Sequence, residues 1–182
     1  MQRFGEIRRR SIGGVALAAA AAALVGAQAV AAAPHVAPSA CAADATTQLR
    51  EAGPYLVTLA VGPVPRMYTV AQAHALKPKS GVVMLEPMRG ATAAGMMGQA
   101  GGSRHIRVQV CDRASGKALA SPRPVVQVTQ AMLREHLPLT RGYDVGTPPS
   151  QVRFCQVAVL PAGSLGVSVQ VGSQSVAFVA TV

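Results

Sequence analysis

Methionine, histidine and cysteine are the side chains of this chain whose types could do chemistry. Four methionines precede a histidine, and the set is Met84, Met88, Met96, Met97 and His105. Thioether and imidazole groups are copper ligands, and a neutral thioether suits Cu(I) in particular, because a soft donor matches a soft, singly charged ion. The spacing matches no closed metal site, and Met84 fits a strand core equally well. These five residues are therefore the candidate metal site, with copper as the first candidate ion.

No catalytic constellation is visible in the sequence. It lacks a Gly-x-Ser-x-Gly elbow, a His-Glu-x-x-His motif, a phosphate-binding glycine loop and a Cys-x-x-Cys-His motif. The acids beyond residue 50 are few, and none forms a close pair that could divide the roles of general acid and base: Glu51, Glu86, Asp112, Glu135 and Asp144. We therefore expect no enzymatic activity and predict no catalytic residues.

From residue 54 onward the sequence has the pattern of an all-β domain. Short runs of β-favouring residues end at turn-forming residues, and they are residues 55–61, 66–70, 82–85, 103–112 and 125–129. Within 103–112, Ile106, Val108 and Val110 alternate with polar residues or cysteine, so the aliphatic side chains share one face. Residues 131–137 fit either a short helix or an edge strand.

The C-terminal hairpin has the best-specified register. A two-residue turn at 172–173 would pair apolar residues across the hairpin: Leu165 with Ala180, Val167 with Phe178 and Val169 with Val176. A slip by one residue would turn this apolar face to water. Short strands with regularly spaced turns predict an antiparallel β-sandwich of the immunoglobulin-like class, with a small barrel as the alternative.

The first 29 residues have the pattern of an export signal. Arginines 8–10 precede an apolar run, residues 12–25, and a small-residue exit, Ala27-Gln28-Ala29. The arginine pair before Ser11 resembles a twin-arginine signal, which directs folded proteins across the membrane; an ordinary secretory signal is the alternative. We expect cleavage after Ala29, and membrane association only if the segment stays uncleaved. The expected location is therefore periplasmic or extracellular.

Composition sets the domain organisation and excludes one class of partner. Residues 30–50 are rich in Ala and Pro, which predicts a flexible linker between the signal, 1–29, and a sandwich domain, 51–182. The signal contributes four arginines and one glutamate, a net +3, so the remainder carries +7 of the total +10. Its basic residues are scattered and its aromatic residues scarce, so we expect no nucleic-acid partner.

The chain has three cysteines, Cys41, Cys111 and Cys155. Disulfides are permitted outside the cytoplasm, and an odd count leaves one thiol unpaired. Cys41 falls in the predicted linker, whereas Cys111 and Cys155 fall in predicted strands. We therefore expect a disulfide between Cys111 and Cys155.

Two segments carry a resemblance to a known group of proteins. They are Ser80-Gly-Val-Val-Met84, with the Met- and Gly-rich residues 90–102 after it, and Arg104-His-Ile-Arg-Val-Gln-Val-Cys-Asp-Arg-Ala-Ser-Gly-Lys117. These segments resemble exported Ig-like proteins related to the periplasmic iron- and copper-binding proteins that accompany ferrous-iron uptake. In that group one strand reads His-Leu-Glu-Val-His-Val before an Asp-x-x-x-Gly turn. A later strand reads His-Tyr-Gly-Asn-Asn before Leu-Pro-Ala-Gly. The resemblance covers residues 55–182 and implies an Ig-like sandwich with iron or copper as its metal.

The same resemblance implies that much of the metal chemistry is lost. His105 and Met84 keep their places, but Arg107 replaces an acid and Gln109 replaces the second histidine. Arg153-Phe-Cys-Gln156 stands where the group has His-Tyr-Gly-Asn. These changes remove donors, and each arginine would repel a bound cation by several kcal/mol. Two arginines on one face could instead hold an anion.

The leading expectation is an exported, non-enzymatic binding or accessory protein of the cell envelope whose metal site is degraded. Its partner would be an envelope protein. Two alternatives remain open. One is a functional periplasmic copper or iron binder that uses His105 and the methionines, and the other is a structural or adhesive envelope module.

Overall fold

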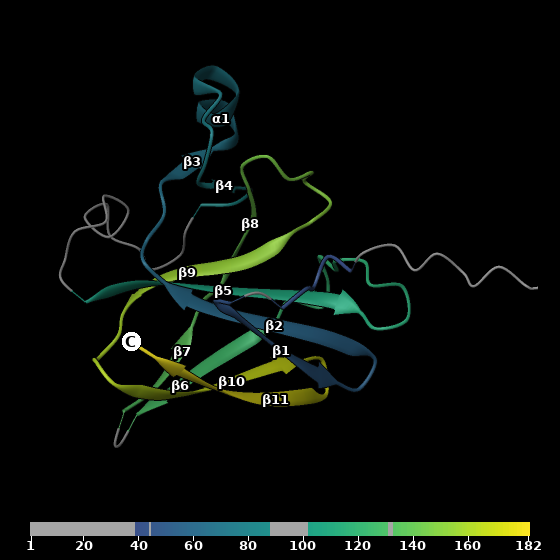
Figure 1. Cartoon of the computed structure of the whole chain (residues 1–182), viewed down its shortest axis with the longest axis vertical. Coiled ribbons are helices and arrows are strands. Elements are labelled where there is room, and N and C mark those ends of the chain that lie inside the picture. The colour runs from purple at the N-terminus through teal and green to yellow at the C-terminus, as the bar shows by residue number, and fades with distance from the viewer. Residues whose placement is uncertain (1–38, 44, 88–101, 131–132) are drawn as a thin grey trace, which may run out of the picture. The chain divides into compact units, whose positions relative to one another are not determined.

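Figure 1 shows the computed structural model of the chain, which describes residues 39–43, 45–87, 102–130 and 133–182. The described strands form two sheets. The larger contains, in sheet order, β1 (Thr47–Ala52), β2 (Tyr55–Gly62), β5 (Ser103–Asp112), β9 (Arg153–Val159), β8 (Thr140–Asp144), β4 (Val82–Met84) and β3 (Met67–Thr69). The smaller contains β11 (Gln174–Thr181), β10 (Ser164–Val171), β6 (Val125–Gln130) and β7 (Leu133–Leu137).

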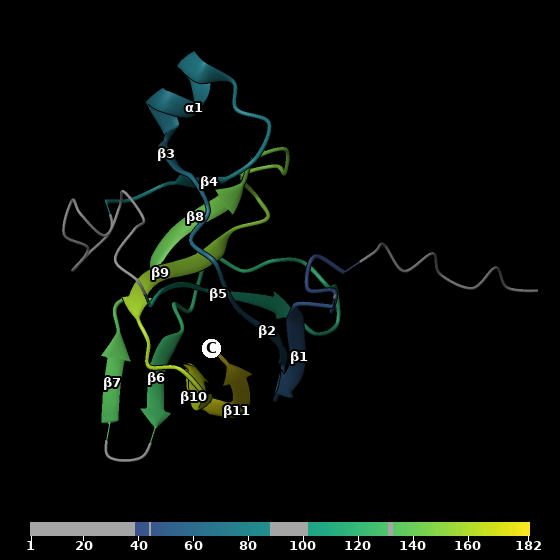
Figure 2. The same cartoon turned by 60° about the vertical axis from the view of Figure 1, so that its left-hand side comes forward.

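The two sheets pack face to face on alternating aliphatic residues. Ile106, Val108 and Val110 of β5 are fully buried, and so are Leu165 and Val169 of β10. All five belong to one hydrophobic cluster drawn from both sheets, which lie as two layers in Figures 1 and 2. Alternation with period two places every second side chain in this core, as the sequence predicted. The predicted two-sheet, sandwich-like architecture is therefore confirmed.

The C-terminal hairpin has the predicted register. β10 and β11 pair Leu165 with Ala180, Val167 with Phe178 and Val169 with Val176, and the turn between them is residues 172–173. Gly172 has φ 60°, the left-handed conformation that a two-residue hairpin turn requires. Of residues 131–137, for which a helix or an edge strand was left open, the described part, Leu133–Leu137, is a strand, β7.

One short helix, α1 (Val70–Leu76), was not predicted. The side chain of Thr69 accepts a hydrogen bond from Gln72 N at 3.2 Å, and Gln72 Oε1 accepts one from Thr69 N at 2.9 Å. This reciprocal capping box satisfies two backbone donors at the helix start. The helix buries no residue, so hydrophobic periodicity gave no signal for it. Within the described ranges, no helix has the length and hydropathy that a membrane span requires.

The folded domain begins earlier than the predicted boundary at residue 51. β1 starts at Thr47 and pairs along its length with β2, and Cys41 is buried. The predicted linker, 30–50, is therefore wrong for its last residues, which form an edge strand. Gln48 Nε2 of β1 also donates a hydrogen bond to Val179 O of β11 at 2.6 Å, which bridges the two sheets. The predicted signal, 1–29, lies outside the described residues.

The larger sheet bends away from the sandwich. In Figures 1 and 2, β8, β4 and β3 rise from β9 on the side opposite the four-stranded sheet, with α1 beyond them. We call the side of the larger sheet that turns away from the four-stranded sheet its outer face. On β5 this face carries His105, Arg107, Gln109 and Cys111, because it holds the residues that alternate with the core aliphatics.

A carboxylate between two arginines fastens the bent part of the sheet to the loop before β6. Glu86 follows β4, and its carboxylate accepts hydrogen bonds from Arg123 Nη2 at 2.7 and 2.9 Å and from Arg141 Nε at 2.6 Å. Burial opposes ionisation of Glu86, but the hydrogen bonds and charges of Arg123 and Arg141 outweigh it and hold its pKa below the usual value. The pairing therefore persists through the neutral pH range.

Replacing Gly81 with alanine is expected to lower the free energy of unfolding by about 3 kcal/mol. Gly81 has φ 120°, and an added Cβ would lie 2.5 Å from Arg66 O and 2.8 Å from Tyr68 Cε2. Gly146→Ala is the matched control, because Gly146 has φ 88° but nothing within 4 Å of its Cβ position. It should therefore cost only the backbone strain, about 1 kcal/mol. Urea unfolding measures both, and equal losses would contradict the predicted clash.

Candidate functional site

The outer face of the larger sheet brings two arginines together around one carboxylate. Arg107 lies on β5, Arg153 on β9 and Asp144 at the end of β8. Arg153 Nη1 donates a short hydrogen bond to Asp144 Oδ2, and Arg107 Nη1 lies 3.5 Å from the same oxygen. Their side chains are 25% (Arg107), 17% (Arg153) and 26% (Asp144) exposed, so water screens the charges only partly. This Arg107–Asp144–Arg153 cluster carries a net charge of +1.

His105 lies two residues before Arg107 and faces the same way. It is 7% exposed, and its Nε2 has no hydrogen-bond partner within the described part of the chain. Burial, followed by the positive charges of Arg107 and Arg153, lowers its pKa to about 4. The ring is therefore neutral at pH 7.

A pocket of about 490 Å³ opens beside these residues. His105, Arg107 and Asp144 line it from the sheet. The loop that leads into β4 contributes Lys79, Ser80 and Gly81, and the remaining walls are mostly apolar: Ala60, Val61, Pro63, Pro65, Val82 and Val145. A concave, largely apolar surface with a few converging polar groups is typical of small-molecule sites.

Of the predicted metal ligands, the structure describes Met84 and His105, and it does not bring these two together. Met84 lies on β4 and packs in a small buried cluster with Val82 and Cys155. His105 lies on β5, three strand spacings away in the sheet order, which is about 14 Å along the sheet. Met88, Met96 and Met97 lie outside the described residues. Within those residues, no group of three or more His, Cys, Asp or Glu side chains is placed to hold a metal ion.

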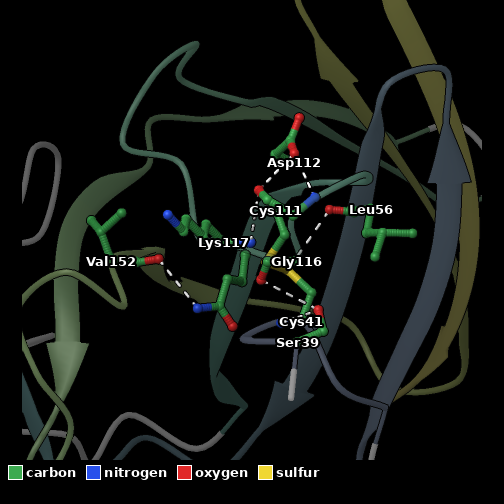
Figure 3. Close-up of a disulfide and its surroundings, with 10 residues drawn as sticks. Ser39, Cys41, Leu56, Cys111, Asp112, Gly116, Lys117 and Val152 are labelled. Atoms are coloured by element: carbon green, nitrogen blue, oxygen red, sulfur yellow. Dashed lines mark hydrogen bonds between the residues drawn. A yellow bond between two sulfur atoms is a disulfide. The ribbon is translucent and has the colours of Figure 1, made fainter. Parts of the chain in front are cut away.

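The predicted disulfide between Cys111 and Cys155 is wrong. Cys111 is bonded to Cys41, and Cys155 is a buried free thiol. The register explains the difference, because β5 and β9 place Cys155 opposite Arg107, four residues along the strand from Cys111. Figure 3 shows how the segment that contains Cys41 lies against β5 and the turn after it. There Ala40 N donates to Gly116 O at 3.0 Å, and Cys41 Sγ lies 3.8 Å from Leu56 O.

The Cys155 thiol is expected to be unreactive. Burial, together with the negative charge of Asp144, raises its pKa to about 12, although Arg107 and Arg153 oppose the shift. A thiol is nucleophilic only as its thiolate, so Cys155 is a packing residue of the outer face and not a reactive group. Its neighbour across the strand pair is Arg107.

Sequence reasoning identified some residues of this pocket and missed others. It singled out His105, Arg107 and Arg153, and it suggested that two arginines on one face could hold an anion. It missed the role of Asp144, which stands 37 residues from Arg107 and meets it only because β8 pairs with β9 and β9 with β5. Lys79 gave no signal, since one lysine in a loop resembles any other.

Comparisons with known proteins found no match. No protein-family model matches the chain, and no curated protein and no solved structure is similar to it. The structure itself shows a β-rich domain of two sheets with one disulfide.

Proposed function

We propose that this chain is an exported, non-enzymatic binding protein of the cell envelope, with an immunoglobulin-like sandwich and a degraded metal site. Its binding site is the pocket beside His105. One observation carries the proposal: the only histidine on this outer face among the described residues lies beside two guanidinium groups that share one carboxylate.

The charge around His105 opposes a bound cation. In the family that the sequence resembles, a carboxylate and imidazoles stand where this chain has Arg107, Gln109 and Arg153. Asp144 brings one negative charge, but both arginines already interact with it. A metal ion at His105 would therefore meet a net positive environment, at a cost of several kcal/mol in a poorly hydrated site.

Two features support the location and the fold class. The Cys41–Cys111 disulfide is typical of proteins that reside in oxidising compartments outside the cytoplasm. Two largely antiparallel sheets packed face to face are the frame of immunoglobulin-like domains. β8, β4, β3 and α1 extend this frame on one side, and β4 and β8 line the pocket through Val82 and Asp144.

Purified protein is expected to show no sub-micromolar binding of Cu(I) or Fe(II). The physical reason is the positive charge of Arg107 and Arg153 near His105, together with the separation of His105 from Met84. The measurement is a chelator competition titration with ascorbate as the reductant, which keeps copper reduced without adding a competing thiol. His105→Ala and Met84→Leu should leave the titration unchanged.

Sub-micromolar Cu(I) binding that is lost in His105→Ala would replace this proposal with the copper-binding alternative. Loss in Met84→Leu as well would show that the two residues meet in a site. Binding that survives both variants would place the metal elsewhere in the chain and leave the pocket without a metal role.

A further inference from the structure

We propose that the pocket beside His105 binds a small organic monocarboxylate, with Arg107 as the principal anchor and His105 as a second polar contact. This inference rests on the proposed function and names the ligand class of the same site. Four features support it: the long contacts of the Arg107 guanidinium, the net charge of the cluster, the buried His105 and the apolar walls.

Arg107 is the arginine of the cluster that is able to take a ligand. Its Nη1 lies 3.5 Å from Asp144 Oδ2 and its Nη2 lies 3.4 Å from Thr47 Oγ1, both at the long limit of a hydrogen bond. Arg153, in contrast, holds Asp144 in a short contact and is the more buried of the two. A ligand carboxylate could therefore form a bidentate pair with the Arg107 guanidinium while Arg153 keeps Asp144.

The charge of the cluster favours a single negative charge on the ligand. Two guanidinium groups and one carboxylate leave +1, and His105 adds none at pH 7 because its pKa is lowered to about 4. Lys79 adds a charge at the rim, where its exposed side chain is screened by water. A carboxylate matches this balance, whereas a phosphate monoester brings a charge of about −1.5 to −2 at neutral pH.

His105 is a buried polar group without a hydrogen-bond partner among the described residues. It lines the pocket, is 7% exposed and has no partner at Nε2. Buried polar atoms in folded proteins almost always have a partner, and leaving one without costs free energy. Nε2 is closed to solvent, so the ring must turn toward the pocket before its Nε2–H can donate to a carboxylate oxygen; that hydrogen bond removes the cost when a ligand binds.

The walls favour a ligand with an apolar tail. Pro63, Pro65, Val82 and Val145 line the pocket of about 490 Å³ together with its polar residues. Burying a methylene group against such walls contributes about 0.8 kcal/mol, so each carbon added to an acetate-like headgroup should raise the affinity. The proposed ligand is therefore a short-chain or ring carboxylate and not a bare oxyanion.

The test titrates the purified full-length protein with three probes at low ionic strength: hexanoate, acetate and inorganic phosphate. Binding is followed through backbone amide shifts of β5 in NMR spectra. We expect saturable binding of hexanoate, at least tenfold tighter than that of acetate or phosphate. Arg107→Gln should weaken hexanoate binding at least tenfold, whereas Arg104→Gln, the same change on the same strand away from the pocket, should leave it within twofold.

A second pair of variants tests the same site independently, in case Arg107→Gln does not fold. Lys79→Gln removes an exposed charge at the pocket rim and should weaken hexanoate binding about threefold, because the charge attracts the anion through water. Lys117→Gln removes an equally exposed charge that does not line the pocket, and it should change nothing. Equal effects of Lys79→Gln and Lys117→Gln would overturn the assignment of the site.

The remaining outcomes separate this inference from the proposed function. Tighter binding of phosphate than of hexanoate would overturn the carboxylate assignment and indicate a phosphate ligand. No saturable binding of any probe would overturn the inference while leaving a binding protein with another ligand. Cu(I) binding that requires His105 would overturn the proposed function itself, through a separate titration.

Discussion

Removing the Cys41–Cys111 disulfide is expected to lower the free energy of unfolding by about 4 kcal/mol in the chain-entropy model. The bond joins residues 70 apart, so it restricts a long loop of the unfolded chain. It also holds the segment around Cys41 against β5, where Cys41 itself is buried. Urea unfolding of Cys41→Ala against the unsubstituted protein measures the loss.

Cys155→Ala is the matched control for this prediction. Cys155 is as buried as Cys41 but forms no disulfide, so its loss should cost only packing, about 1 kcal/mol. A reductant should lower the stability of Cys155→Ala and of the unsubstituted protein while leaving Cys41→Ala unchanged. If Cys41→Ala and Cys155→Ala lose the same amount, the disulfide contributes nothing beyond its packing.

Acidification from pH 6.5 to pH 4 is expected to lower the free energy of unfolding by about 3 kcal/mol through His105 alone. The pKa of His105 is about 4 in the folded protein, because burial and then the charges of Arg107 and Arg153 oppose the imidazolium form, against an ordinary value of 6.5. Between these values the unfolded chain binds a proton that the folded protein does not. Stability is therefore full above pH 6.5 and is lost as the pH falls toward 4.

The measurement is the urea midpoint at a series of pH values between 7 and 4 for two histidine variants. His105→Gln should flatten the dependence in this window, whereas His74→Gln, at an exposed position of α1, should keep it. The carboxylates with lowered pKa, Glu86 and Asp112, lose their contribution as the pH falls through their ordinary values of 4.5 and 3.8, so both variants should share a further loss near pH 4, and the two are compared above about pH 5. An unchanged dependence in His105→Gln would rule out this role for the histidine.

The strands that bury one aliphatic face could be predicted from the sequence, and the elements without such a face could not. The alternation in 103–112 and 165–171 follows from one face of each strand packing on the other sheet, and both strands formed as expected. β1 buries only its last residue, Ala52, and α1 buries nothing, so neither shows a hydrophobic period. The capping box of Thr69 and Gln72 was the signal for α1, and it was visible in the sequence.

The candidate site depends on register, which local patterns do not specify. The sequence placed His105 and Arg107 on one face correctly, because alternation within a strand decides it. It paired Cys111 with Cys155 because both lie in strands, whereas the β5–β9 register sets Cys155 opposite Arg107. Asp144 joins the cluster only through two strand pairings, so its contact with the arginines cannot be predicted from the spacing of these residues in the sequence.

The bridge between β1 and β11 has a consequence for self-association. β1 and β11 are edge strands of different sheets, and the Gln48–Val179 hydrogen bond ties them together on one side of the sandwich. Among the described strands, β7 is the other edge of the smaller sheet. That edge bears Arg134 and Glu135 at successive exposed positions, and charged side chains discourage edge-to-edge stacking of this kind. At one edge of the smaller sheet a hydrogen bond to the larger sheet opposes the addition of a strand from a second chain, and at the other edge charged side chains oppose it.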